Sequence, residues 1–199
     1  MTDLSLDSTT PLLGRTLPID RKIVDPIRLG DYDVIGLLAR GGMGGVYLGE
    51  HRVTKARVAL KVLDPHWARN KDIVARMFAE HEFANRASHP GLLEISDAKI
   101  DEEDGSPYLV MELLDGENLG DLVERGRLVP GAIAAIGAQI ARAVCALHDA
   151  GVIHCDLKPD NVFVLYEHGL RGWPNVKVLD YGVSRNVSEG ISESIAGTP

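Results

Sequence analysis

The sequence predicts an α+β protein in two parts, a β-rich first half and a helical second half. Short apolar runs separated by turn residues occupy the chain up to about residue 114, a pattern typical of a small antiparallel sheet. Beyond Asp115-Gly116, apolar residues recur at steps of three and four, which is typical of a helix with one buried face. We interpret the Asp-Gly pair as a hinge between the two parts.

Composition limits the classes of function. The chain has 199 residues, of which 45% are hydrophobic and 25% charged, with a formal net charge of -8. Nucleic-acid partners are not expected, because proteins that bind them carry basic patches. Two cysteines and the lack of a secretory signal predict a cytoplasmic protein with reduced thiols. No apolar run is long enough to cross a bilayer, so no membrane span is expected in this chain.

The elements of the first half follow from local patterns. Residues 1–28 are rich in Ser, Thr, Pro and Asp without periodicity, which predicts a disordered N-terminal tail. We expect strands at residues 32–38, 46–49, 58–63, 92–100 and 108–113. A helix over residues 70–87 would share one apolar face among Val74, Met77, Phe78 and Ala84.

A second, longer helix is predicted after the hinge. Its apolar stripe consists of Ile133, Ile136, Ile140, Val144 and Leu147. Gly151 follows and can end the helix in a left-handed conformation. The short apolar pieces VIH, VFVLY and VKVLD come next, divided by polar loops.

A glycine-rich segment, ARGGMGGV at residues 39–46, lies between the first two predicted strands. Glycines let the backbone approach a ligand and direct its N–H groups at phosphate oxygens. A flexible hairpin turn is the plain alternative for the same residues. Walker-type phosphate loops lead from a strand into a helix, so this segment fits a hairpin that covers a nucleotide.

Lys61 occupies a predicted strand in the run VALK. Most strand lysines are solvated at the surface, and that alternative applies here too. A buried lysine requires an acidic partner, and the following helix offers Glu80 and Glu82. The two lie on different helix faces, and the spacing back from Ser88-His89-Pro90 favours Glu80.

The run HCDLKPDN, residues 154–161, places an acid, a cation and an amide in one short loop. Phosphoryl transfer uses these three groups: Asp156 to orient a hydroxyl and accept its proton, Lys158 to offset phosphoryl charge, and Asn161 to hold Mg²⁺. Asp180, in the run LDYG, supplies a second oxygen ligand of the kind that Mg²⁺ prefers. A polar surface turn is the alternative.

The ordered motifs ARGGMGGVY, VALK, SHP, YLVMELLDG, HCDLKPDN, DYG and GTP resemble the eukaryotic-like serine/threonine protein kinases of bacteria. The resemblance covers residues 30–199. It implies a bilobal, protein kinase-like fold with a β-rich N-lobe at residues 29–114 and an incomplete helical C-lobe at residues 115–199. It also implies transfer of the γ-phosphate of Mg-ATP to protein Ser or Thr hydroxyls, with ATP and Mg²⁺ as cofactors.

The same resemblance assigns roles to individual residues. The catalytic groups would be Asp156, Lys158, Lys61 and Glu80, and the metal ligands would be Asn161 and Asp180. The cofactor-binding set would be Leu38, Gly41, Gly44, Val46, Ala59, Lys61, Met111, Glu112, Leu114 and Phe163. Within that set, Met111 would be the gatekeeper. The backbones of Glu112 and Leu114 would bind the adenine edge. Tyr181 and His154 would stack in an internal spine that links the lobes.

The sequence departs from the family pattern at several positions. Ala39 replaces the first loop glycine, Tyr181 replaces a phenylalanine, and Phe163 lies where leucine is usual. Cys155 replaces the arginine that grips a phosphorylated activation loop in the family, and a thiol cannot pair with phosphate. We therefore expect little dependence on phosphorylation of the candidates Ser188, Ser192, Ser194 and Thr198.

The chain ends within the activation-loop motif, at residues 197–199, whereas the family continues into further C-lobe helices. The resemblance therefore implies a C-lobe truncated after the activation loop, with the helix face at Ile136, Ile140 and Val144 exposed. Self-association through that face is one hypothesis. A catalytically impaired, pseudokinase-like module that binds ATP is the alternative function, and an inert fragment is a third.

Overall fold

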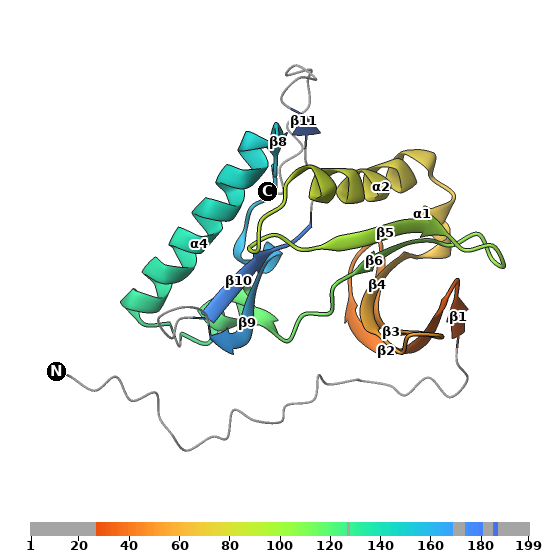
Figure 1. Cartoon of the computed structure of the whole chain (residues 1–199), viewed down its shortest axis with the longest axis horizontal. Helices are drawn as coiled ribbons and strands as arrows, with labels where there is room; N and C mark the ends of the chain where they lie inside the picture. The colour runs from red at the N-terminus through yellow and green to blue at the C-terminus, as the bar shows by residue number, and fades with distance from the viewer. Residues whose placement is uncertain (1–26, 127, 169–173, 181–184, 187–199) are drawn as a thin grey trace.

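The computed structural model describes residues 27–126, 128–168, 174–180 and 185–186. Figure 1 shows a curled sheet with helix α2 beside it, and a second group of strands beside helix α4. The elements of the first half are β1 (Ile27–Leu29), β2 (Tyr32–Arg40), β3 (Gly44–His51), β4 (Arg57–Leu63), α1 (Pro65–Ala68), α2 (Lys71–Arg86), β5 (Ile95–Ile100) and β6 (Pro107–Met111). The second half contains β7 (Gly116–Asn118), α3 (Leu119–Glu124), α4 (Pro130–Asp149), β8 (Val152–Ile153), the 3₁₀ turn η1 (Pro159–Asn161), β9 (Val162–His168), β10 (Pro174–Val178) and β11 (Arg185–Asn186).

The first half is an antiparallel sheet of six strands in the order β1-β2-β3-β4-β6-β5. Strand β6 lies between β4 and β5 and is buried along its whole length. Its apolar run therefore belongs to a strand covered on both faces, whereas β2 and β3 are only partly buried along their lengths. Helix α2 covers one face by packing on β5 and β6 (Figure 1).

Helix α2 begins where the sequence places a capping residue. The side chain of Asn70 accepts hydrogen bonds from the backbone N–H groups of Asp72 and Ile73, at 3.0 and 3.3 Å, which satisfies the first turn. The helix buries Met77 and Phe83 against the sheet. Glu80 lies on the same buried face, so the helix carries one carboxylate into the interior.

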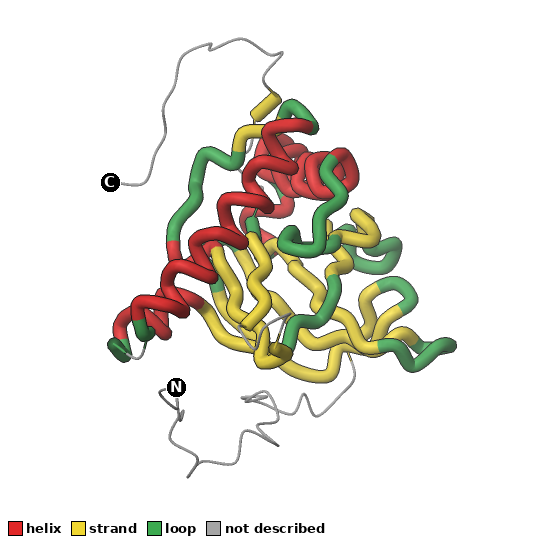
Figure 2. The backbone as a smooth tube through the Cα atoms, turned by 60° about the vertical axis from the view of Figure 1, so that its left-hand side comes forward, coloured by secondary structure: helices red, strands yellow, loops and turns green. Residues whose placement is uncertain are grey.

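The second half consists of the three-stranded sheet β10-β9-β7 and the long helix α4. Helix α4 packs on β10 and β8, and Figure 2 shows it lying across the strands of this half. The expected left-handed end of α4 is confirmed, because Gly151 has a φ of +74°. Strand β11 pairs with β8, which joins the residues after Asp180 to the segment before Asp156.

The buried face of α4 differs from the predicted stripe. Ile136 and Leu147 are buried together with Ala132 and Ala143, whereas Ile133 is 55% exposed. The expectation that Ile136 would be exposed is wrong, because its side chain packs with buried residues of α3, β9 and β10. Ile140 and Val144 are half-buried. The spacing of apolar residues at steps of three and four predicted the helix correctly. Its buried face is rotated by about one residue from the predicted stripe, because Ala132 and Ala143 are buried in place of Ile133 and Val144.

One apolar cluster joins the two halves. It contains Leu109 and Met111 from the sheet, Phe83 from α2 and Leu147 from α4. Backbone hydrogen bonds reinforce it, because Leu93 donates to the carbonyl of Val178 at 3.0 Å and Val178 donates to that of Gly91 at 2.8 Å. The strand that leads to Asp180 is therefore fixed to the sheet half. The predicted lobe boundary at residue 114 stays a prediction.

Two short elements, β1 and α1, lie where the sequence predicted a tail and a break. Ile27–Leu29 forms strand β1, so the tail predicted for residues 1–28 is wrong at its last two positions, and residues 1–26 lie outside the described residues. The break expected at Asp64-Pro65 contains the short helix α1.

Helix α4 is long and apolar enough to cross a membrane by length and composition, although Ala143 and Leu147 are fully buried. The absence of a membrane span stays a prediction.

Candidate active site

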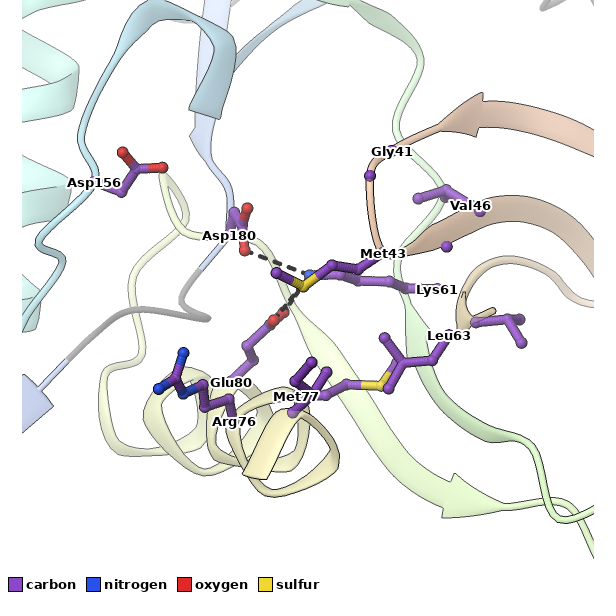
Figure 3. Close-up of a pocket in the computed structure, with 15 residues that line it drawn as sticks. Gly41, Met43, Val46, Lys61, Leu63, Arg76, Met77, Glu80, Asp156 and Asp180 are labelled. Atoms are coloured by element: carbon purple, nitrogen blue, oxygen red, sulfur yellow. Dashed lines mark hydrogen bonds and ion pairs between the residues drawn. The ribbon is translucent and has the colours of Figure 1, made fainter. Parts of the chain in front are cut away.

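The central feature of the site is the side chain of Lys61, which extends from β4 toward α2. Its Nζ donates to both carboxylate oxygens of Glu80, at 2.8 and 2.7 Å, and lies 3.4 Å from Oδ1 of Asp180. Figure 3 shows Lys61 reaching both carboxylates from the sheet side. The prediction of Glu80 over Glu82 is confirmed, because Glu82 is exposed on another face of the helix.

Burial and charge oppose each other in this pair. Burial lowers the pKa of the Lys61 ammonium, but the carboxylates of Glu80 and Asp180 outweigh it and hold the pKa above 10.5. Burial raises the pKa of the Glu80 carboxyl, and the Lys61 ammonium opposes that rise. Two short hydrogen bonds keep the proton on nitrogen, so Lys61 and Glu80 form an ion pair at neutral pH.

The predicted catalytic loop has the side-chain contacts that its chemistry requires. Nζ of Lys158 lies 3.0 Å from Oδ2 of Asp156, and this contact raises the pKa of Lys158. Nδ2 of Asn161 donates to the backbone carbonyl of Asp156 at 2.8 Å and to its Oδ2 at 3.0 Å. The carboxylate of Asp156 is therefore held between a cation and an amide, with one oxygen directed by both.

His154 anchors this loop from inside the protein. It is 3% exposed, and its Nε2 lies 2.9 Å from the backbone carbonyl of Leu179. The backbone N–H of Asp156 donates to its Nδ1 at 3.3 Å. The neutral ring with its proton on Nε2 satisfies both contacts. His154 therefore ties Asp156 to the residue before Asp180, while its predicted stacking partner, Tyr181, lies outside the described residues.

Asp180 and Asn161 fit the predicted metal site by their donor chemistry. The backbone N–H of Leu179 donates to the carbonyl of Asn161 at 2.8 Å, which holds the two segments together. Nδ2 of Asn161 is used by Asp156, so Oδ1 remains as an acceptor. A carboxylate and an amide oxygen are ligands that Mg²⁺ prefers. The described residues contain no cluster of three or more acidic, His or Cys ligands. Mg²⁺ that is bound through one or two protein oxygens takes its other ligands from phosphate and water.

A cavity of about 380 Å³ connects these groups with the glycine-rich loop. Its lining includes the predicted site residues Gly41, Gly44, Val46, Lys61, Glu80, Asp156 and Asp180. A Cβ at Gly44 would lie 2.0 Å from the carbonyl oxygen of Val62, so only glycine lets β3 approach β4 here. A Cβ at Gly41 would meet nothing closer than 3.7 Å, so packing does not require that glycine.

Of the predicted adenine-binding residues, Val46 lines this cavity, whereas the others lie outside its lining. Strand pairing places Ala59 opposite Met111, and both are buried in the main apolar cluster. Leu38, Val46 and Leu114 pack against the same cluster, and Phe163 lies on β9 opposite Lys177. The N–H of Glu112 donates to the carbonyl of Glu94, and its own carbonyl has no hydrogen-bond partner among the described residues.

The structure adds residues that the motifs did not identify. Ile73, Arg76 and Met77 line the cavity from α2. Lys177 lies 2.6 Å from Oε1 of Glu112 and donates to the carbonyl of Leu92 at 3.1 Å. This largely buried lysine ties β10 to the predicted hinge. Sequence reasoning missed it because its partners are 65 and 85 positions away.

The departures from the family pattern are partly visible. Cys155 has a φ of +62°, its side chain is exposed, and its Sγ lies 3.5 Å from the carbonyl of Ile153. Ala39 is exposed near the end of β2. The phosphorylation candidates Ser188, Ser192, Ser194 and Thr198 lie outside the described residues.

A strand lysine paired with a helix glutamate, facing an Asp–Lys–Asn loop beneath a glycine hairpin, is the arrangement that defines a protein kinase. The chain belongs to the protein kinase domain family, whose model matches residues 32–199. The resemblance stated from the motifs is confirmed, and with it the α+β, bilobal fold class.

The relatives described next are bacterial. The chain is 39% identical over 171 residues to the serine/threonine-protein kinase Pkn1 of Myxococcus xanthus, with 86% of this chain and 24% of that protein covered. It is 35% identical over 163 residues to PknD of Mycobacterium tuberculosis, with 81% and 23% covered. The chain thus spans about a quarter of the length of these relatives. A crystal structure of the M. tuberculosis PknI kinase domain has a TM-score of 0.64 at 28% identity, with 79% of this chain and 61% of that chain covered.

Proposed function

We propose that the chain acts as an ATP-dependent protein kinase that phosphorylates serine or threonine hydroxyl groups of proteins. The observation that supports the proposal most strongly is the contact of Lys61 with both Glu80 and Asp180. It places the cation of the sheet half against the predicted metal ligand, with Asp156 lining the same cavity. The names of the relatives, all serine/threonine-protein kinases, agree with this chemistry.

Each residue of the site has a separate role in the proposed reaction. Lys61 binds ATP phosphate oxygens while Glu80 holds it in place, and bound Mg²⁺ would offset charge on the β- and γ-phosphates. Asp156 orients the acceptor hydroxyl and takes its proton as the oxygen bonds to the γ-phosphorus. The bond from that phosphorus to the β–γ bridging oxygen breaks, ADP leaves, and Lys158 balances the charge on the transferring group.

Transfer of labelled γ-phosphate from ATP to casein tests the proposal. Asp156→Ala removes the proton acceptor and Lys61→Met removes the phosphate-binding cation, so we expect each to lower the transfer rate at least about a hundredfold. Arg28→Gln, an exposed change at the far end of the sheet, is the matched control and should retain the wild-type rate. Transfer that persists in both site variants would refute the assignment. ATP binding without transfer in the wild type would instead support the regulatory alternative.

Self-association is a separate proposal about partners. A groove between α3 and α4 is lined mostly by apolar residues, among which Val123 and Ile133 are 53% and 55% exposed. Exposed apolar surface of this kind favours association. Light scattering on the purified chain measures it, and a monomer over the whole accessible concentration range would contradict the proposal.

A cytoplasmic location is likewise proposed. Cys145 and Cys155 are both free and exposed, which suits a reducing compartment. Fractionation of cells that express the natural gene would test this, and recovery of the protein outside the cytoplasm would contradict it.

A further inference from the structure

The tip of the glycine-rich loop is attached to the corner between β4 and α2. The indole Nε1 of Trp67 donates to the backbone carbonyl of Gly42 at 3.2 Å. The backbone N–H of Asp64 donates to the carbonyl of Met43 at 2.9 Å. The side chain of Asp64 lies 3.3 Å from the guanidinium of Arg40. Three contacts from one corner therefore hold three of the loop residues, Arg40, Gly42 and Met43.

Trp67 is itself firmly placed. It lies in the short helix α1, where its backbone N–H donates to the carbonyl of Asp64 at 2.9 Å. Its ring is half-buried against the main apolar cluster and meets the ring of His66 edge-on, with 5.0 Å between the ring centres. An indole has few rotatable bonds, so a packed ring presents its N–H in a fixed direction. The corner is thus anchored in the main apolar cluster.

Apart from the hydrogen bond from the N–H of Gly41 to the carbonyl of Gly44 at 2.9 Å, the loop tip makes few contacts. A Cβ built at Gly42 would meet nothing within 4 Å, and the side chain of Met43 is 53% exposed. The peptide between Gly42 and Met43 is trans, so its C=O and N–H point in opposite directions. Holding the Gly42 carbonyl on Trp67 therefore turns the N–H of Met43 away from α1. That N–H has no partner in the described part of the chain and lies in the loop that lines the cavity.

We propose that Trp67 is a positioning residue that holds the glycine-rich loop in the orientation that binds the phosphates of a nucleoside triphosphate. This inference rests on the proposed function, because it assumes that ATP is the ligand of the cavity. The indole touches no substrate atom and acts through the backbone at Gly42. The ring of Trp67 packs against the cluster that contains Ala59 and Met111, but its N–H contacts only the loop carbonyl of Gly42 among the described contacts, so loss of that donor should affect phosphate binding.

The conservative variant Trp67→Phe keeps an aromatic ring but lacks the N–H donor. One neutral hydrogen bond is worth a factor of about two to ten in affinity. We expect Trp67→Phe to raise the dissociation constant for Mg-ATP about two- to tenfold and to leave that for adenosine unchanged. Calorimetric titration of wild type and variant with each ligand measures both. The apo melting temperature of each protein separates a loss of folding from a loss of positioning.

The outcomes distinguish this proposal from the proposed function. Equal Mg-ATP affinities in wild type and Trp67→Phe would overturn the role of Trp67 alone. A matching loss for adenosine would also overturn it, because a merely structural role affects both ligands. Failure of the wild type to bind Mg-ATP would overturn the proposed function and this inference together.

Fluorescence offers a test that does not depend on the stability of Trp67→Phe. The other tryptophan, Trp173, lies outside the described residues, so Trp173→Phe leaves Trp67 as the single emitter. Mg-ATP should then shift or quench the emission of Trp67, because the loop carbonyl on its indole responds to phosphate binding. Adenosine should not. An emission spectrum unchanged at saturating Mg-ATP would contradict the proposal.

Discussion

Two buried carboxylates in the β-rich half show how a structural acid differs from a functional one. Glu80 is 5% exposed and Asp101 is 6% exposed. Asp101 accepts three backbone N–H groups, from Gly30, Glu103 and Asp104, at 2.7, 2.8 and 3.1 Å. Glu80 instead pairs with one side chain, Lys61.

The difference lies in whether the partner can also serve a ligand. The backbone donors of Asp101 belong to two turns, and they fix β1 against the turn between β5 and β6. Nζ of Lys61 also lies 3.4 Å from Oδ1 of Asp180, which belongs to the other half of the chain. One ammonium group therefore serves two carboxylates that line the cavity. A carboxylate held by amides stabilises a fold, whereas one that holds a shared cation prepares a binding site.

The largest expected effect is a difference in catalytic activity between variants of Glu80 and variants of Asp101. Glu80→Gln removes the charge that holds Lys61, and displacement of a catalytic group by about 1 Å can cost a hundredfold in rate. We expect kcat/KM for ATP to fall about 10- to 100-fold in Glu80→Gln. The matched variant Asp101→Asn should change kcat/KM less than about twofold. Steady-state phosphate transfer measures kcat/KM in both variants. Equal losses would contradict the difference between a functional and a structural carboxylate.

The second prediction concerns the free energy of unfolding, to which Asp101 contributes without affecting ligand binding. Asp101→Ala leaves buried backbone donors without an acceptor, which costs about 2–3 kcal/mol of unfolding free energy. Urea unfolding of the chain measures this loss. Mg-ATP affinity, determined under native conditions, should stay at the wild-type value. A weakened affinity in Asp101→Ala would show that the two regions are coupled.

Acid unfolding gives a smaller and more specific signature. Burial alone would raise the pKa of Asp101, but the backbone N–H groups of Gly30, Glu103 and Asp104 lower it below 3.8. The folded pKa is depressed, so the stabilisation is present above pH 3.8 and is lost as the pH falls through the folded value. Asp101→Asn should lack this acid-side loss. Identical slopes of stability against pH in the two proteins, below pH 4, would contradict the assignment.

The sequence predicted most of the elements that position the site. The alternation around Lys61 and the helical spacing of Met77 and Phe78 correspond to β4 and α2. The motif order also brought Asp156, Asn161 and Asp180 to one place. These predictions succeeded because local periodicity and short loops define them. The short elements β1 and α1 were missed, since three or four residues carry no periodic signal.

Residues whose roles depend on distant partners were not predictable in this way. Asp101 was part of an ordinary polar turn in the sequence, yet Gly30, 71 positions away, is its closest donor. Trp67 belongs to no motif of the sequence, and its contact with Gly42 lies 25 positions back along the chain. Such contacts follow from how the sheet curls and where the corner at Asp64 turns, and one sequence does not specify either.

We propose that Asp180 and Asn161 form a Mg²⁺ site opposite the Lys61–Glu80 pair. Calorimetric titration with ATP, with and without Mg²⁺, tests it most directly in the wild type and in Asp180→Asn. We expect Mg²⁺ to tighten ATP binding at least about tenfold in the wild type and to have little effect in Asp180→Asn, because one carboxylate ligand is lost. The same Mg²⁺ enhancement in both proteins would contradict it.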